Sequence, residues 1–110
     1  MAMEPKEVVT SKDYEENLIE ILEYTIETYG HAQACKYFNT ISHHVERLDS
    51  FYTYYPECRH IPTKSRMYRN IILDAHLIIY RITDTRIEVL DIVHGASSIS
   101  KIRRVRKIRL

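Results

Sequence analysis

The chain has 110 residues, of which 45% are hydrophobic and 28% are charged. This length predicts one domain, residues 1–110, with a thin hydrophobic core. No segment is apolar over the roughly 18 residues that a membrane helix needs, and the N-terminus lacks the features of a signal peptide. We therefore expect a cytoplasmic protein without membrane association. The two cysteines, Cys35 and Cys58, make no disulfide framework, and we expect both to be reduced thiols.

The net charge of +1 hides a strong asymmetry between the two halves of the chain. Residues 1–57 carry 11 acidic and 4 basic side chains, whereas residues 58–110 carry 4 acidic and 12 basic ones. A half this basic indicates a polyanion or an acidic protein as partner. The alternative is that the two halves neutralise each other within one fold.

The first half predicts a short strand at residues 6–10 and then two helices. Thr10, Ser11 and Asp13 are candidate N-caps, and Gly30 is placed to end the first helix in the left-handed conformation. The apolar residues of both helices recur every three or four positions. They are Leu18, Leu22, Thr25 and Tyr29 in the first helix, and Cys35, Phe38, Ile41, Val45, Leu48 and Tyr52 in the second. The short connection predicts an antiparallel αα-hairpin, with Cys35 in the core.

The second half predicts three strands, at residues 67–73, 77–82 and 86–93, because these runs are rich in Ile, Val, Leu and Tyr. The short link at residues 83–85 indicates a tight hairpin, and the three strands together form an antiparallel meander. The predicted fold is therefore α+β, in the order β-α-α-β-β-β, with a basic C-terminal tail or short helix at residues 97–110. We expect the sheet to pack one face on the helical hairpin and to leave the other more open.

Three segments also resemble a known family. They are the helical stretch EILEYTIETYGHAQACKYFNTISHHVERL, the pair Tyr68-Arg69, and the segment IIYRITDTRIEVLDIVHG. In this order they resemble the RelE/ParE toxin superfamily over residues 6–96, and the His-Gly at residues 94–95 is similar to the ParE-like branch. The resemblance implies the toxin of a bacterial type II toxin–antitoxin system, of the kind linked to plasmid stabilization. It also implies a cognate antitoxin that wraps around the toxin, and hence a hetero-oligomer.

The resemblance leaves two molecular targets open. ParE-like members poison DNA gyrase, whereas RelE-like members cut mRNA on the ribosome. RelE-like ribonucleases usually place an arginine at the start of the middle strand and a basic pair after the last strand. Here those positions hold Leu77, Ala96 and Ser97, which supply no positive charge. The departure favours the ParE-like gyrase inhibitor, with ribosome-dependent mRNA cleavage as the alternative, and whether the chain is an enzyme stays open.

If the chain is a ribonuclease, the catalytic candidates are His94, Arg81 and Arg69. His94 would act as a general acid or base, and the two arginines would contact the phosphate. The alternatives are structural: His94 as a strand-end residue, and Arg69 paired with a carboxylate of Asp74, Asp91 or the antitoxin. Tyr80 and Arg81 must point to opposite faces of the sheet, so at most one faces a given groove.

We expect no cofactor and no metal. His43 and His44 are adjacent, so on a helix they diverge by about 100° and cannot chelate one ion together. Cys58 and His60 lack a second pair of ligands at zinc spacing.

The tail SSISKIRRVRKIRL is the most unusual segment of the chain. Apolar residues recur every three positions at Ile99, Ile102, Val105 and Ile108. The six cations between them are Lys101, Arg103, Arg104, Arg106, Lys107 and Arg109. One interpretation is docking on a protein partner or nucleic acid, which includes a third function, a non-enzymatic nucleic-acid-binding module. A second is a terminal helix that caps the chain's own core with solvated cations outside. A third is a membrane-surface helix.

Overall fold

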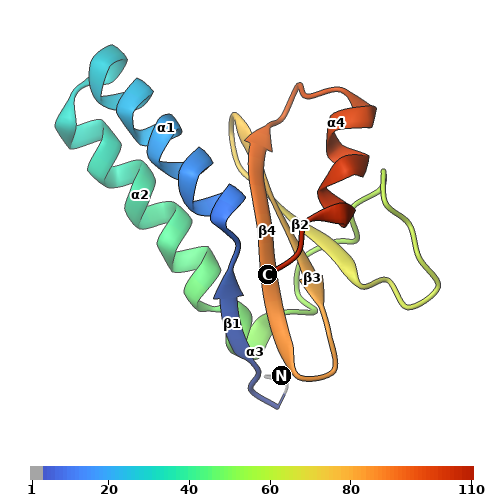
Figure 1. The fold of residues 1–110 in the computed structure, drawn as a ribbon. Coiled ribbons are helices and arrows are strands. Elements are labelled where there is room, and N and C mark those ends of the chain that lie inside the picture. The colour runs from blue at the N-terminus through green and yellow to red at the C-terminus, as the bar shows by residue number, and fades with distance from the viewer. Residues whose placement is uncertain (1–3) are drawn as a thin grey trace.

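The computed structural model describes residues 4–110, which form a four-stranded sheet, helices and short connections (Figure 1). The elements in chain order are β1 (Glu7–Thr10), α1 (Lys12–Tyr29), α2 (His31–Glu46), α3 (Leu48–Phe51), β2 (Tyr68–Ile72), β3 (His76–Ile82), β4 (Arg86–His94), α4 (Ile99–Arg104) and the 3-10 turn η1 (Val105–Lys107). The α+β class and the predicted element order are confirmed. Within the described residues, no helix is long and apolar enough to cross a membrane.

The sheet has the strand order β1-β4-β3-β2, and β2, β3 and β4 form the predicted antiparallel meander. The strand at the start of the chain joins this meander at its far edge, where β1 pairs with β4 in parallel. A register shift interrupts the pairing of β3 with β4: Ile79 faces Asp91, whereas Tyr80 faces Val89. Leu90 is therefore the extra residue of a β-bulge.

The two long helices form the predicted αα-hairpin, and particular residues begin and end α1. Among the candidate caps, Ser11 is the N-cap of α1: its hydroxyl oxygen accepts from the Tyr14 N–H at 2.9 Å. The same hydroxyl donates to the Leu90 carbonyl of β4, which ties the start of the helix to the sheet. Gly30 ends the helix with φ 91° and ψ 170°, so it is not in the predicted left-handed helical conformation. This conformation is nevertheless one that essentially only glycine adopts.

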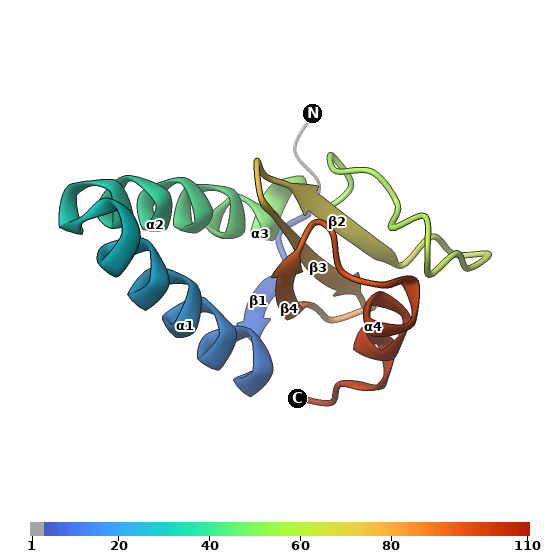
Figure 2. The same cartoon turned by 90° about the horizontal axis from the view of Figure 1, so that it is seen from above.

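The hydrophobic core between the hairpin and the sheet holds the larger cluster of buried side chains. It comprises Tyr14, Ile41, Leu48, Tyr52, Tyr55, Ile71, Ile78, Tyr80, Ile87, Val89 and Ile92. The predicted core position of Cys35 is wrong, because Cys35 is exposed while Ala34 and Ile41 are buried. The hairpin projects beyond the sheet (Figure 2), so apolar residues near its tip have no layer to pack against.

The second face of the sheet is covered, so the expectation of a more open face is wrong. Figure 2 shows the sheet between the hairpin on one side and α4 on the other. The second cluster comprises Cys58, Ile61, Ile79, Leu90, Val93, Ile102 and Val105. The tail and the loop between α3 and β2 therefore supply the layer that the sheet face needs to exclude water.

Candidate functional site

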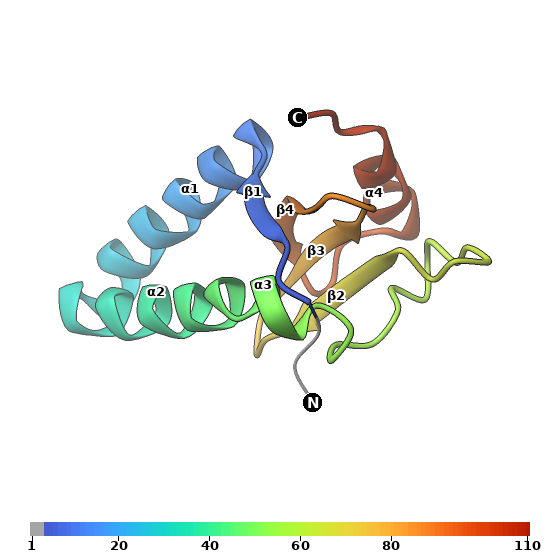
Figure 3. The same cartoon turned by 90° about the horizontal axis from the view of Figure 1, so that it is seen from below.

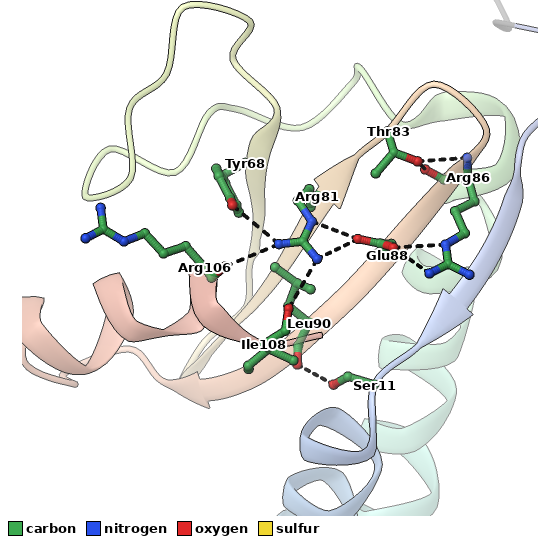
Figure 4. A network of polar contacts seen from close by, with 9 residues as sticks. All are labelled: Ser11, Tyr68, Arg81, Thr83, Arg86, Glu88, Leu90, Arg106 and Ile108. Atoms are coloured by element: carbon green, nitrogen blue, oxygen red, sulfur yellow. Dashed lines mark hydrogen bonds and ion pairs between the residues drawn. The ribbon is translucent and has the colours of Figure 1, made fainter. Parts of the chain in front are cut away.

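Arg81 is held by contacts within the chain (Figure 4). On β3 it lies opposite Glu88 of β4, and its guanidinium lies 2.6 Å from the carboxylate. The same guanidinium donates to the Tyr68 hydroxyl at 3.4 Å and to the carbonyls of Arg106 and Ile108 at 3.3 and 3.2 Å. Arg81 therefore fastens the C-terminal tail to the sheet, and most of its donors are already used.

Glu88 is the acceptor at the centre of this network. Its second carboxylate oxygen lies 2.8 Å from the guanidinium of Arg86. Burial alone would raise the pKa of Glu88, but the hydrogen bonds from Arg81 and Arg86 outweigh burial and hold that pKa below its ordinary value. Glu88 thus stays charged, and its charge is matched within the fold.

Arg69 is also committed to structural contacts. It donates to the backbone carbonyls of Thr53 at 3.0 Å, Tyr55 at 2.9 Å and Arg66 at 3.2 Å. The alternative in which Arg69 pairs with Asp74 or Asp91 is therefore wrong. The guanidinium instead satisfies carbonyls of the loop that joins α3 to β2, a segment without regular hydrogen bonding of its own.

His94 lies exposed at the end of β4, far from both arginines along the sheet. Its Nδ1 atom accepts from the Ala96 N–H at 3.1 Å. His94 pairs with His76, the first residue of β3, whereas Arg81 lies five positions further along that strand. At about 3.3 Å per residue this separation is roughly 17 Å. The structure therefore does not bring the three predicted catalytic residues together.

A groove of about 740 Å³ opens where the hairpin leaves the sheet. The ring of His76 lines the groove, 5.6 Å from the His94 ring between centroids. The Nδ1 atom of His76 lies 2.6 Å from the hydroxyl of Tyr37 on α2. Tyr24 and Tyr29 of α1 also line the groove. Both helical and strand residues supply polar groups to this aromatic groove.

Two polar groups of the groove, His76 and Tyr37, have pKa values shifted toward their neutral forms. Burial, and then the neighbouring His94, lower the pKa of His76. Burial, and then the charge of Asp74, raise the pKa of Tyr37. No three metal-ligating side chains gather anywhere in residues 4–110. His76 and Tyr37 thus favour uncharged contacts, and Glu20 and Asp74 are the carboxylates that line the same groove.

The sequence analysis did not single out His76 as a site residue, although the register of the hairpin between β3 and β4 indicates that it lies near His94. The hairpin pairs Ile82 with Ile87, and a regular register continued from there would place His76 opposite Val93. The β-bulge at Leu90 shifts the pairing by one residue and brings His94 opposite His76 instead. The bulge is set by packing, so the alternation of residues along the strands cannot predict it. The sequence could therefore place the rings of His76 and His94 near each other but not directly opposite.

The tail packs on the sheet through its apolar residues. Ile102 and Val105 are buried against β3 and β4, and Ile108 is partly buried. The six predicted binding cations are all exposed: Lys101, Arg103, Arg104, Arg106, Lys107 and Arg109. Of the three interpretations of the tail, the structure therefore shows the second, a terminal helix that caps the chain's own core. The binding role of the cations stays a prediction.

The fold and the comparisons together define a toxin of the RelE/ParE superfamily, in its ParE-like branch. The family described as "ParE toxin of type II toxin-antitoxin system, parDE" matches residues 8–99, and the chain belongs to this family. The solved structure described as "Chromosomal ParDE TA system from P. aeruginosa" is similar, with a TM-score of 0.67 and 16% identity. That similarity covers 84% of this chain and 98% of the other. No curated protein sequence matches the chain.

Proposed function

We propose that this type II toxin acts by binding and inhibiting DNA gyrase or a related topoisomerase in the bacterial cytoplasm. The observation that carries the proposal is the family match over residues 8–99. Inhibition by binding needs surface complementarity and no assembled catalytic group. This requirement fits a fold whose candidate catalytic side chains lie apart.

The chemistry of RNA cleavage supports the same choice. Attack by a 2′-hydroxyl needs a base at the hydroxyl and cations at the phosphate, all within reach of one substrate. Arg81 is paired with Glu88, and Arg69 is bonded to loop carbonyls. Leu77, where RelE-like enzymes carry an arginine, packs against the buried cluster under the tail. These contacts leave neither Arg81 nor Arg69 beside His94 to hold a phosphate.

A cognate antitoxin is the second part of the proposal. The hairpin exposes large apolar side chains to 43–68% of their area, an arrangement that indicates a covered surface in the functional state. They are Ile19, Tyr24, Tyr29 and Phe38. An antitoxin segment with apolar residues for the hairpin and groove would match this surface in a hetero-oligomer.

The target is tested with purified gyrase and the full chain in a DNA supercoiling reaction. We expect loss of supercoiling or accumulation of cleaved DNA, and recovery when the product of the neighbouring gene is added. A parallel translation reaction with mapping of mRNA ends tests the alternative. Cut mRNA with normal supercoiling would overturn the gyrase proposal and make His94, Arg69 and Arg81 the residues to mutate.

The antitoxin surface is tested by a matched pair of substitutions. Tyr24→Ala removes an exposed ring at the groove, whereas Tyr54→Ala removes an equally exposed ring outside it. We expect Tyr24→Ala to weaken antitoxin binding by about tenfold or more, since truncation of a buried aromatic anchor costs about 2 kcal/mol or more. Equal affinities for the two variants, measured by calorimetry, would remove the hairpin groove from the interface.

A further inference from the structure

The tail presents a surface that is almost purely cationic. Ile102 and Val105 are buried against the sheet, whereas the cations of α4 and η1 are exposed to solvent. The large apolar residues of the tail that remain exposed are Ile99 and Leu110, at its two ends. The middle of the tail therefore offers charge and hydrogen-bond donors without an apolar anchor.

The loop between α3 and β2 extends this surface. Figure 3 shows the loop running along β2, and its residues Cys58 and Ile61 pack in the same cluster as Ile102. Arg103 reaches the His60 carbonyl at 3.4 Å. Arg59 and Lys64 of this loop are exposed. We call these two residues and the six tail cations the basic face.

The carboxylates near the basic face do not neutralise it. Glu88 is buried and bonded to arginines of the sheet. Asp91 is buried and accepts from the Asn17 side chain at 2.7 Å, and burial raises its pKa although Lys101 opposes that shift. Glu57 lies 3.6 Å from Arg66, which is not counted in the basic face. The exposed cations thus keep most of their charge for an external partner.

We propose that the basic face binds the phosphate backbone of duplex DNA without reading its sequence. Phosphate contacts need exposed arginines and lysines and no apolar anchor, whereas a protein partner or a membrane needs buried apolar or aromatic residues. Residues 57–67 and 97–110 contain no Phe, Tyr or Trp on which unpaired bases would stack. The charge pattern therefore fits a duplex better than a single strand.

The test measures binding of the full chain to a labelled 20-base-pair duplex by fluorescence anisotropy at salt concentrations from 50 to 200 mM. If about four phosphates are contacted, the logarithm of the association constant should fall with a slope of about −3.6 against the logarithm of the salt concentration. This slope corresponds to about a 150-fold loss of affinity between 50 and 200 mM salt. Two duplexes of unrelated sequence should bind equally. Absence of binding at 50 mM salt, or a slope near zero, would overturn the proposal.

A matched pair of double variants locates the contact. Arg104→Gln with Lys107→Gln removes two cations of the basic face whose side chains make no hydrogen bond or ion pair within residues 4–110. Lys12→Gln with Lys36→Gln removes two exposed cations of the helical hairpin. We expect the first variant to reduce the magnitude of the salt slope by about 1.8 and the second to leave it unchanged.

Competition distinguishes DNA from other polyanions. Polyglutamate and vesicles with anionic lipids are added to the labelled complex at equal charge concentration. Duplex DNA should displace the label at least tenfold more effectively than either competitor. Equal displacement by polyglutamate would indicate an acidic protein as the partner, and equal displacement by vesicles a membrane surface, and either result overturns the proposal. Circular dichroism confirms that each variant is folded.

Discussion

The guanidinium of Arg81 and the carboxylate of Glu88 lie 2.6 Å apart across β3 and β4, with 14% and 9% of their side chains exposed. The pair lies beneath the tail, and Arg81 also bonds two tail carbonyls. An arginine that sequence comparison makes a candidate for phosphate binding is thus a structural element that joins sheet and tail (Figure 4). This geometry leads to the first prediction.

Replacement of Arg81 by Met should lower the free energy of unfolding by about 2–4 kcal/mol, because one partner of a largely buried ion pair is lost. Arg86 still contacts Glu88, which limits the loss. Urea denaturation measures the effect. Arg86→Met is the control and should cost less than about 1 kcal/mol, since the Arg86 side chain is 36% exposed. Equal costs for the two variants would contradict the central role of Arg81.

The tail should contribute to stability through its buried face. Ile102→Ala removes a side chain that is 2% exposed and should cost about 2–4 kcal/mol, from lost burial and the cavity left behind. Ile99→Ala, in the same helix but 48% exposed, should change stability by less than about 1 kcal/mol. Thermal denaturation compares the two. An equal effect of both changes would mean that the tail is detached in solution.

The buried hydroxyl of Tyr80 should matter by itself. It donates to the Tyr52 carbonyl at 2.6 Å, and the side chain is fully buried. Tyr80→Phe leaves this carbonyl without its partner and should cost about 1–3 kcal/mol in urea denaturation. Tyr29→Phe changes an exposed ring and serves as the matched control. A cost for Tyr80→Phe no larger than that for Tyr29→Phe would show that water replaces the bond.

Stability should decrease on mild acidification because of His76. Its folded pKa is lowered, so the fold favours the neutral ring. This contribution is complete above the unfolded pKa of about 6.5 and is lost as the pH falls below that value toward the folded pKa. Tyr37 and His94 contact the ring, and Asp74 and Glu20 line the same groove.

The measurement is the urea midpoint of the chain between pH 7.5 and 5. The urea midpoint of the His76→Gln variant should decline less steeply with falling pH than that of the wild type. The reason is that glutamine cannot take up a proton as the histidine ring does. Part of the decline should remain, since burial also lowers the pKa of His44. His31→Gln, at the exposed hairpin tip, should follow the wild-type curve. A His76→Gln curve parallel to that of the wild type would show that the ring does not couple to folding.

The sequence by itself determined the local elements of this protein. Periods of three to four residues specified the hairpin helices, and runs of β-branched residues specified the meander, because these signals depend on neighbours close in the chain. Even so, the buried face of α2 was misplaced at Cys35, since burial there depends on how far the sheet extends beneath the helix. The charge asymmetry and the family resemblance are also properties of the sequence alone.

The tertiary structure alone decided which candidate side chains are free. Pairing of β1 with β4, the bulge at Leu90 and docking of the tail all join residues distant in sequence, and local periodicity carries no information about such pairs. These contacts placed His94 beside His76 and bound Arg81 to Glu88. The tail's apolar stripe was compatible with several partners. It is buried here because the second face of the sheet was the apolar surface within its reach.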